Sequence, residues 1–273
     1  MTLKALSVAG FDGSGGAGIT SDVKIFSKLK LFGLSAITVM TAQNPDKIYK
    51  AEPVSNDFLT AQLKSAFGYF SVDVVKIGLV FNEDQSSILA GFLKKYKPKT
   101  VVLDPVYIST SGKLLTAQSG SGYPGSLLPL FKYATAVTPN IKEAELISGI
   151  MINGQNKMKI AAKIIRERIP GIKNIIIKGS HIFEKSDGGV IKNVVLDSKN
   201  KFFVHESKIL KTGKQIHGTG CAFSACIASY LGLGMPIESA VLESEKFVSG
   251  IIRGTKKIPD NSPDKNIYIV GNI

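Results

Sequence analysis

Short apolar runs rich in β-branched residues alternate along this chain with stretches of helical periodicity. Such runs are typical of strands that are covered on both faces, as in a parallel sheet. The stretches between them are amphipathic; in the first, Ile19, Val23 and Phe26 fall on one helical face. This alternation predicts right-handed crossovers and an α/β fold, with helices on both faces of a central, mainly parallel sheet. The predicted strands are Ala5–Ala9, Ser35–Met40, Val72–Ile77, Thr100–Leu103, Ala134–Val137 and Asn174–Ile177.

One later segment departs from this alternation. Gly188–Ser207 is predicted to form an antiparallel hairpin with Asp197–Lys201 as its turn. The 273-residue chain contains no long linker, low-complexity segment or internal repeat, so we expect a single domain over residues 1–273. Ligands of open parallel sheets bind at the carboxyl ends of strands, and the segments that follow the strands are therefore where site residues are expected.

Composition narrows the class of protein. The formal net charge of +13 suits either nucleic acid or a phosphate-bearing ligand such as ATP. The basic residues are scattered, and no nucleic-acid recognition motif accompanies them, so a basic nucleic-acid-binding protein is the less favoured alternative. Gln215–Ile237 lacks charged residues, but its Gly, Ser and His residues favour a buried helix with loops over a membrane span. Cys221 and Cys226 have neither CxxC nor zinc-site spacing, and no signal peptide is indicated, so we expect a reduced, cytoplasmic protein.

The first predicted strand is followed by a glycine-rich segment, Gly10–Gly18. Three of its glycines match GxGxxG, but a dinucleotide site also needs an acidic residue near the end of the second strand, where the chain has Met40–Gln43. Two interpretations remain: a tight strand-to-helix turn, or a glycine platform that lets a small ligand approach backbone amides. In the second, Asp12 and Asp22 would hydrogen-bond the ligand; for Asp22, inside a helix, a plain surface position is the default explanation.

A second glycine-containing segment, Gly218–Cys221, precedes the uncharged predicted helix Ala222–Leu231. Free backbone amides and the partial positive charge of a helix N-terminus make an anion hole suited to a phosphoryl group in transfer. The alternative is a tight turn with Cys221 packed as a small hydrophobe. A thiol in this position is expected to have a lowered pKa.

Charged residues follow three of the later strands. Asn140 and Glu143 stand at a helix start, where they can form a capping box. Alternatively, Asp104 and Glu143 hold Mg²⁺ through water beside ATP phosphates. Lys178 can reach a phosphate oxygen or simply end its strand in solvent. No GxxxxGK[ST] and no HRD and DFG set occur, so neither a P-loop NTPase nor a protein kinase is supported.

Several motifs stand in a fixed order: AGFDGSGGAGITSDVK (9–24), TAQN (41–44), KIGL (76–79), VLDPV (102–106), TPNIKEAE (138–145), IKGSH (177–181) and HGTGC (217–221). In that order they resemble the hydroxymethylpyrimidine and phosphomethylpyrimidine kinases of the ribokinase superfamily. The resemblance implies a ribokinase-like fold, use of ATP and Mg²⁺, and a homodimer. It also implies phosphorylation of 4-amino-5-hydroxymethyl-2-methylpyrimidine and then of its monophosphate, in thiamine biosynthesis.

The resemblance further implies roles for individual residues. The pyrimidine would be bound by Gly10, Asp22 and Gln43, with Leu79 and Val106 as pocket walls. The nucleotide would be contacted by Lys178, Thr219 and Asn140, and magnesium would be held by Asp104 and Glu143. Catalysis would fall to Gly218, Gly220 and Cys221, where many superfamily members carry aspartate in place of the cysteine. As a partial thiolate, Cys221 would accept or orient the hydroxyl proton of the acceptor.

Pyridoxal and pyridoxine kinases are the nearest alternative, because some share this architecture and the cysteine. Gln43 favours the aminopyrimidine, since a side-chain amide can both donate to and accept from its edge. The chain departs from the family pattern at Phe11, where Ser or Thr is usual. The flap lacks the lysine expected near Thr110, for which Lys113 is a substitute, and Ser119–Gly125 is an additional Gly/Ser stretch.

Overall fold

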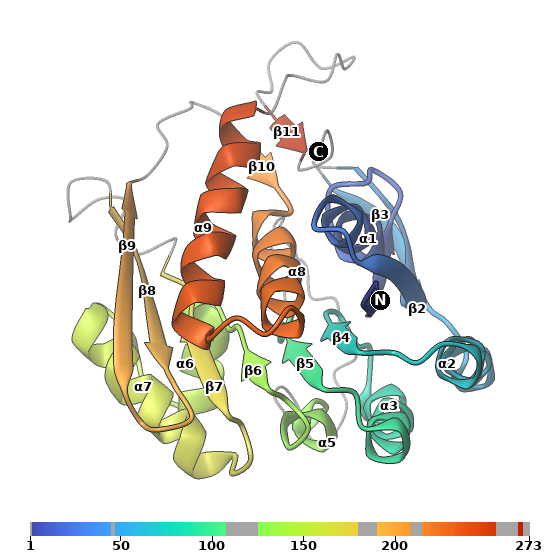
Figure 1. Ribbon diagram of the computed structural model, residues 1–273, viewed down its shortest axis with the longest axis horizontal. Coiled ribbons are helices and arrows are strands. Elements are labelled where there is room, and N and C mark those ends of the chain that lie inside the picture. The colour runs from blue at the N-terminus through green and yellow to red at the C-terminus, as the bar shows by residue number, and fades with distance from the viewer. Residues whose placement is uncertain are drawn as a thin grey trace.

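A nine-stranded sheet runs through the molecule in the order β3-β2-β1-β4-β5-β6-β7-β8-β9 (Figure 1). The computed structural model describes residues 2–44, 47–107, 125–179, 190–208, 215–254 and 267–269. From β2 through β1, β4, β5 and β6 to β7 the neighbours are parallel, while β3 at one edge and β8 and β9 at the other are antiparallel. The strands are β1 Lys4–Asp12, β2 Phe32–Gln43, β3 Ile48–Pro53, β4 Val74–Ile77, β5 Thr100–Leu103, β6 Ala136–Val137, β7 Asn174–Ile177, β8 Val190–Leu196 and β9 Phe202–Lys208, with β10 Gln215–His217 and β11 Ile267–Ile269 forming a separate two-stranded sheet.

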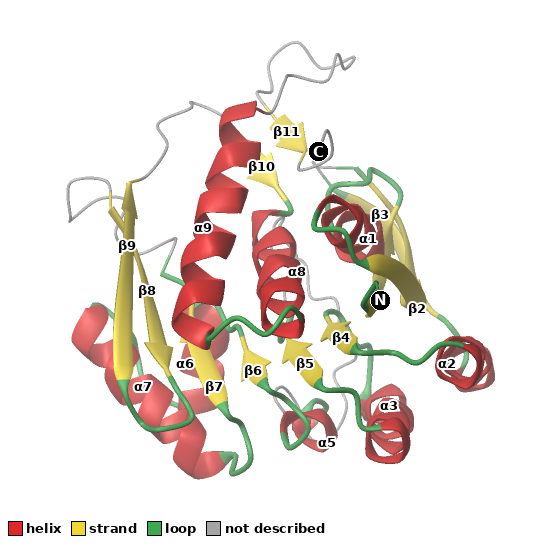
Figure 2. Cartoon of the chain, in the orientation of Figure 1, coloured by secondary structure: helices red, strands yellow, loops and turns green. Residues whose placement is uncertain are grey.

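Helices cover both faces of the large sheet, as the sequence predicts (Figure 2). One buried cluster lies under α1, α8 and α9, and a second lies under α2, α3, α5, α6 and α7. Successive strand residues alternate between the two: Val74 of β4 belongs to the first cluster and Val75 to the second. The helices are α1 Gly18–Lys28, α2 Asn56–Tyr69, α3 Glu83–Tyr96, α5 Leu128–Phe131, α6 Ile141–Ser148, α7 Gln155–Arg168, α8 Thr219–Gly232 and α9 Ile237–Gly254.

The predicted strands are all present; Thr100–Leu103 and Asn174–Ile177 have the predicted bounds, and the other four have shifted ends. The second is the longest, Phe32–Gln43, and the fifth shrinks to Ala136–Val137. The hairpin is also confirmed, and its turn is closed by Asp197, whose carboxylate accepts hydrogen bonds from the backbone N–H groups of Lys199 and Lys201 at 2.9 and 2.7 Å. The antiparallel edge strand β3 was not predicted, because its residues are mostly exposed and carry no apolar run.

The uncharged segment Gln215–Ile237 contains the buried helix that the sequence predicts. α8 is a helix of 14 residues whose middle, from Ala222 to Ser229, is wholly buried. Within the described ranges, no helix combines the length and apolar character needed to cross a bilayer. α8 begins at Thr219, three residues before the predicted start at Ala222, so Cys221 lies inside its first turn.

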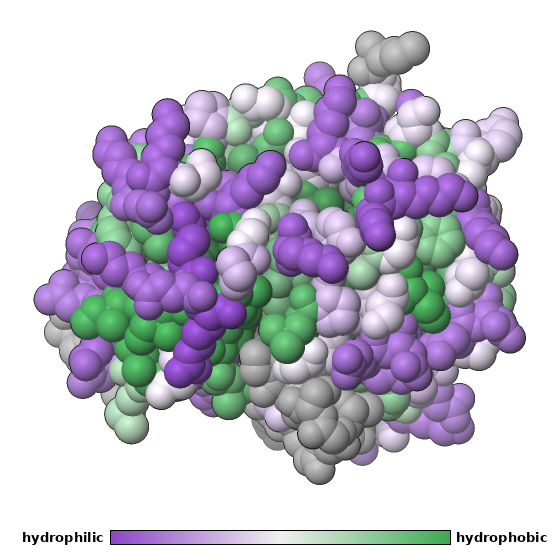
Figure 3. Space-filling view, turned by 90° about the horizontal axis from the view of Figure 1, so that it is seen from below, coloured by the Kyte–Doolittle hydropathy of each residue, from purple (hydrophilic) through white to green (hydrophobic). Residues whose placement is uncertain are grey.

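One face of the molecule carries a mixture of polar and apolar side chains. On the face shown in Figure 3, hydrophilic side chains lie in several groups with apolar ones between them.

The predictions for the flap around Thr110 and Lys113, and for all but the last residue of Ser119–Gly125, fall outside the described residues.

Candidate functional site

The carboxyl ends of the parallel strands bring distant polar residues to one edge of the sheet. The backbone N–H of Asp104 donates to the Ile77 carbonyl at 2.8 Å, and that of Thr138 donates to the Leu103 carbonyl at 3.0 Å. The ladder thus continues for one residue past β5 and β6, and the backbone N–H of Lys178, which follows β7, donates to the Pro139 carbonyl at 2.9 Å. Asp104, Thr138 and Lys178 consequently stand side by side at the edge where ligands of such sheets bind.

Asp104 is the centre of this group and is 1% exposed. Its Oδ1 accepts from Lys178 Nζ at 2.7 Å and from Thr138 Oγ1 at 3.0 Å, while its Oδ2 accepts from Ser224 Oγ at 3.0 Å. Burial opposes ionisation, but Lys178 and then Lys76 outweigh it and lower the pKa of Asp104. The carboxylate is therefore ionised and fixed from strand and helix sides at once.

Asn140 and Glu143 form the capping box that the sequence allowed. Asn140 Oδ1 accepts from the Glu143 backbone N–H at 2.9 Å, and Glu143 Oε2 accepts from the Asn140 N–H at 2.8 Å. Burial raises the pKa of Glu143 to about 7; Lys178 opposes this rise and Asp104 adds to it. Glu143 therefore has the structural role of the capping box, and its carboxyl group is also near enough to Asp104 for the charge of Asp104 to raise its pKa.

The raised pKa of Glu143 predicts a specific pH dependence of stability. The unfolded carboxyl group loses its proton near its ordinary pKa of 4.5, whereas the folded one keeps it up to about 7. Between these values the folded state binds more protons, so stability falls as pH rises, by on the order of 3 kcal/mol in all. Glu143→Gln keeps a capping residue of the same shape and should flatten this fall. Urea unfolding of both proteins at pH 5 and pH 8 measures it; parallel curves would contradict the assignment.

The glycine-rich segment folds back onto the end of β1. Asp12, 1% exposed, organises it: its carboxylate accepts from the Ser14 and Ala17 backbone N–H groups at 2.8 and 2.9 Å. Gly18 has φ +58°, and a Cβ there would lie 2.1 Å from the Gly10 carbonyl oxygen. Only glycine fits this close approach. Asp12, considered from sequence as a ligand contact, has at least this structural role.

The first turn of α8 touches that segment directly. Gly218 is the helix N-cap with φ +90°, and a Cβ on it would lie 1.7 Å from the carbonyl oxygen of Gly16. Thr219, Gly220 and Cys221 are the first three helical residues, whose N–H groups have no partner within a helix. The two glycine-containing segments predicted as acceptor platform and anion hole are therefore in contact.

Lys178 also borders this turn. A Cβ added to Gly220 would lie 3.7 Å from Lys178 Nζ, which is ordinary contact. The lysine ammonium, its partner Asp104 and the N–H groups of the first turn of α8 thus lie together, and the N–H groups at a helix start favour an anion.

The prediction of a lowered pKa for Cys221 is wrong. The partly exposed side chain takes a hydrogen bond from the Gly18 backbone, yet burial raises the pKa of the thiol. Lys76 opposes this rise, but the carboxylates of Asp104 and Asp22 reinforce it. The helix N-terminus alone therefore does not make this cysteine a thiolate at neutral pH.

Asp22 is not the surface residue that its helical position suggested. It is 0% exposed, and its Oδ2 accepts from Lys76 Nζ at 2.9 Å and from Ser7 Oγ at 2.5 Å. Among the described residues its Oδ1 has no hydrogen-bond partner. Burial disfavours the charged form of Lys76, but Asp22, Cys221 and Asp104 together outweigh this effect and raise the pKa of Lys76.

Lys76 is one of the site residues that sequence reasoning missed. It is 0% exposed and lies in β4, whose other members are all apolar. A lysine within such a run was the available signal, because a buried ammonium requires a partner.

The remaining predicted acceptor residues lie around the same edge. A Cβ on Gly10 would meet Leu79 Cδ2 at 3.1 Å, so these two residues are neighbours. Gln43 ends β2 and Val106 follows β5, both partly exposed. Within the part of the chain that the structure describes, no side-chain hydrogen bond or ion pair joins Gln43 to the charged group around Asp104.

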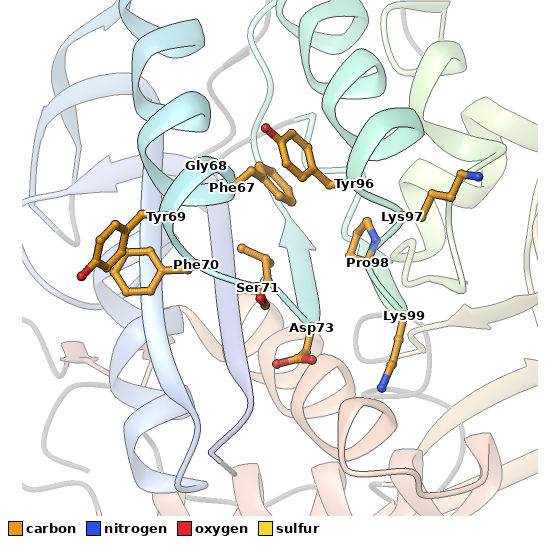
Figure 4. Close-up of a pocket in the computed structure, with 11 residues that line it drawn as sticks. Phe67, Gly68, Tyr69, Phe70, Ser71, Asp73, Tyr96, Lys97, Pro98 and Lys99 are labelled. Atoms are coloured by element: carbon orange, nitrogen blue, oxygen red, sulfur yellow. The ribbon is translucent and has the colours of Figure 1, made fainter.

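A cavity of about 410 Å³ lies at the opposite edge of the sheet, where α2 and α3 end and β4 and β5 begin. In Figure 4, Phe67 and Tyr96 lie against each other, with ring centroids 5.0 Å apart, while Lys97 and Lys99 extend away from the rings. The charged residues that line this cavity are Asp73, Lys97 and Lys99, and none of the strand-end residues described above is among them. The chemistry of the site therefore belongs to the carboxyl edge.

Comparison with known proteins gives a consistent result. The Phosphomethylpyrimidine kinase family matches residues 12–263. A hydroxymethylpyrimidine/phosphomethylpyrimidine kinase of Haemophilus influenzae is 38% identical over 91% of this chain and 90% of its own length. The crystal structure of a phosphomethylpyrimidine kinase from Clostridium difficile has a TM-score of 0.75 and 34% identity, over 92% of this chain and 100% of that one. The pyridoxal kinase of Staphylococcus aureus, in complex with AMP-PCP, has a TM-score of 0.83 at 27% identity, over 98% and 93%.

Proposed function

The chain belongs to the phosphomethylpyrimidine kinase family, and we propose that its site moves the γ-phosphoryl group of ATP onto the primary alcohol of hydroxymethylpyrimidine and then onto the resulting monophosphate. This is a phosphotransferase of thiamine biosynthesis acting as a single domain. The observation that carries the proposal is the contact between Gly218 and Gly16, because it joins the amides of the α8 first turn to the acceptor platform. Donor phosphate and acceptor hydroxyl would meet there.

The nucleotide side is formed by Lys178, Thr219 and Asn140. Lys178 is held by Asp104 at 2.7 Å and is positioned to give its charge to a phosphate oxygen. The three open N–H groups of the α8 first turn, with Gly218 and Gly220 leaving the backbone bare, would stabilise negative charge on the migrating group. Positioning and charge neutralisation would supply most of the rate acceleration.

Asp104 and Glu143 are suited to Mg²⁺. Their oxygens are hard ligands, and Asp104 adds to the raised pKa of Glu143, so a cation between them would relieve the repulsion. No third carboxylate, His or Cys joins them into a cluster within the described ranges. Magnesium usually retains several waters and needs few protein ligands, which fits such a pair. The bound ion would neutralise phosphate charge.

The acceptor side is formed by Gly10, Gln43, Leu79 and Val106, with Asp22 beneath them. Gln43 offers the pyrimidine edge a donor and an acceptor, and Leu79 lies against the bare backbone of Gly10. Asp22 is buried together with Lys76, and its Oδ1, which has no hydrogen-bond partner among the described residues, is the atom that it would offer to the acceptor.

Three further proposals follow from family membership. The active protein is a homodimer, it works in the cytoplasm, and its partners are ATP and the small pyrimidine rather than nucleic acid or a membrane. Both cysteines are free, which agrees with a reducing compartment.

A coupled ADP-release assay tests the function. Hydroxymethylpyrimidine and its monophosphate should both support turnover, each with kcat/KM at least about tenfold above that for pyridoxal. Pyridoxal is tested alongside because the structure of the pyridoxal kinase of Staphylococcus aureus is similar to this one, with a TM-score of 0.83. A preference for pyridoxal would overturn the assignment, and turnover on the alcohol alone would restrict it to the first phosphorylation.

A further inference from the structure

We infer that Asn193 and Glu245, to which nothing above assigns a role, position Lys178 for the nucleotide. This inference rests on the proposed function in so far as Lys178 is taken to contact ATP. The two residues come from β8 and α9, and neither lies in a motif that suggested chemistry. Both are nearly inaccessible, at 5% and 9% exposure.

A chain of two hydrogen bonds links α9 to the residue after Lys178. Asn193 Oδ1 accepts from the Gly179 backbone N–H at 3.0 Å, and Asn193 Nδ2 donates to Glu245 Oε1 at 2.6 Å. The bonds span 14 and 52 residues in sequence, so they join three separate elements. Gly179 is thereby connected, through Asn193, to helix α9.

This link acts where the sheet stops supporting Lys178. The antiparallel ladder between β7 and β8 runs from Ile175 to its last pair, Ile177 with Val194. Asn193 is the next residue of β8, and its side chain takes over by holding Gly179. On the other side, the Lys178 N–H donates to the Pro139 carbonyl at 2.9 Å. The backbone of Lys178 is thus clamped from both neighbours.

Glu245 fixes the orientation of the Asn193 side-chain amide. An asparagine side chain can present either its oxygen or its nitrogen to a neighbour. Only the oxygen can accept from the Gly179 N–H. Because Glu245 accepts from Nδ2, it fixes the amide with its oxygen toward Gly179. Burial raises the pKa of Glu245, and in either protonation state it retains an oxygen that can accept this bond.

We call the hydrogen-bonded chain from Glu245 through Asn193 to Gly179 the relay. Exchanging the amide of Asn193 and the carboxyl group of Glu245 tests its role. Asn193→Asp sets two buried carboxyl groups against each other and should raise the KM for ATP about ten- to hundredfold, with the KM for the pyrimidine nearly unchanged. Glu245→Gln alone should change it less than threefold or so, because the amide oxygen still accepts. In the double variant Asn193→Asp/Glu245→Gln, the aspartate accepts from Gly179 and from the new amide. Its KM for ATP should therefore return to within about threefold of the original.

Asn174 provides the matched control. It is 8% exposed and lies at the amino end of β7, the strand that Lys178 follows. It also bridges two segments: its Nδ2 donates to the Thr135 carbonyl at 2.8 Å and its Oδ1 accepts from the Ser198 N–H at 3.2 Å. Asn174→Asp should lower the melting temperature but leave the KM for ATP unchanged. If Asn193→Asp behaves like this control, or if the double variant does not recover, the inference is wrong.

Calorimetric binding of an ATP analogue separates this inference from the proposed function. The affinities should follow the same order as the KM values, whichever acceptor the enzyme uses. Failure to phosphorylate pyrimidines would therefore overturn the function without touching the relay. Equal analogue affinities in all variants would overturn the relay and leave the function in place.

Discussion

Replacing Lys76 with methionine should lower the free energy of unfolding by about 3–5 kcal/mol, because it leaves a buried carboxylate without its cation. The side chains of Lys76 and Asp22 are both 0% exposed, and Lys76 Nζ lies 2.9 Å from Asp22 Oδ2. After the substitution, Ser7 would be the one hydrogen-bond partner left to Asp22 among the described residues. Urea denaturation at neutral pH measures the change.

Two further variants make this expectation sharp. Asp22→Asn in the Lys76→Met background removes the stranded charge and should recover a large part of the lost stability. The exposed pair of Lys50 and Glu52, at 2.6 Å with 71% and 64% exposure, is the matched control, and Lys50→Met should have little effect. A double variant no more stable than Lys76→Met alone would contradict the charge-pair explanation.

Replacing Cys221 with alanine should reduce kcat by about 10²–10⁴-fold while binding of an ATP analogue is retained. The thiol lies in the first turn of α8 and takes a hydrogen bond from the backbone of Gly18, so it faces the acceptor platform. Steady-state kinetics and calorimetry measure the two quantities separately. Near-normal turnover would refute the role of the thiol.

The pH dependence distinguishes how the thiol works. Because burial raises the pKa of Cys221, the thiolate fraction grows about tenfold per pH unit at neutral and mildly alkaline pH. If the thiolate accepts the hydroxyl proton, kcat should rise over this range in the native enzyme and not in Cys221→Ala. A flat profile would contradict proton acceptance. Cys226→Ala is the control, since that cysteine is 0% exposed and packs in the core beneath α8 and α9.

The sequence predicts the frame of this molecule well because the frame is built from local patterns. Apolar runs such as Thr100–Leu103 are buried throughout, and their period distinguishes them from the amphipathic helices between. The edge strand β3 lacks that pattern. Its position follows from pairing with β2, in which Thr41 stands opposite Ala51, and pairing between strands is not visible in a single run of residues.

The site is predictable where it lies at strand ends, and less so where its members are paired across the fold. Asp104 and Lys178 were found because each follows a strand. Lys76 was missed because its partner Asp22 is 54 residues away, and Ser224 was missed because it reaches Asp104 over 120 residues. The pKa of Cys221 was predicted with the wrong sign because the sequence shows a helix N-terminus but not the burial or the two carboxylates that outweigh it.

The close approach of Gly218 to Gly16 has a consequence for how the two substrates communicate. Because a methyl group on Gly218 would not fit against Gly16, neither segment can move toward the other without displacing it. If the first turn of α8 binds phosphate and the Gly10–Gly18 segment binds the acceptor, as proposed, binding of one substrate would alter the affinity for the other, and by thermodynamic reciprocity to the same extent in both directions. Substitutions at Gly218 should accordingly be poorly tolerated, since a side chain added there would disturb both proposed binding segments.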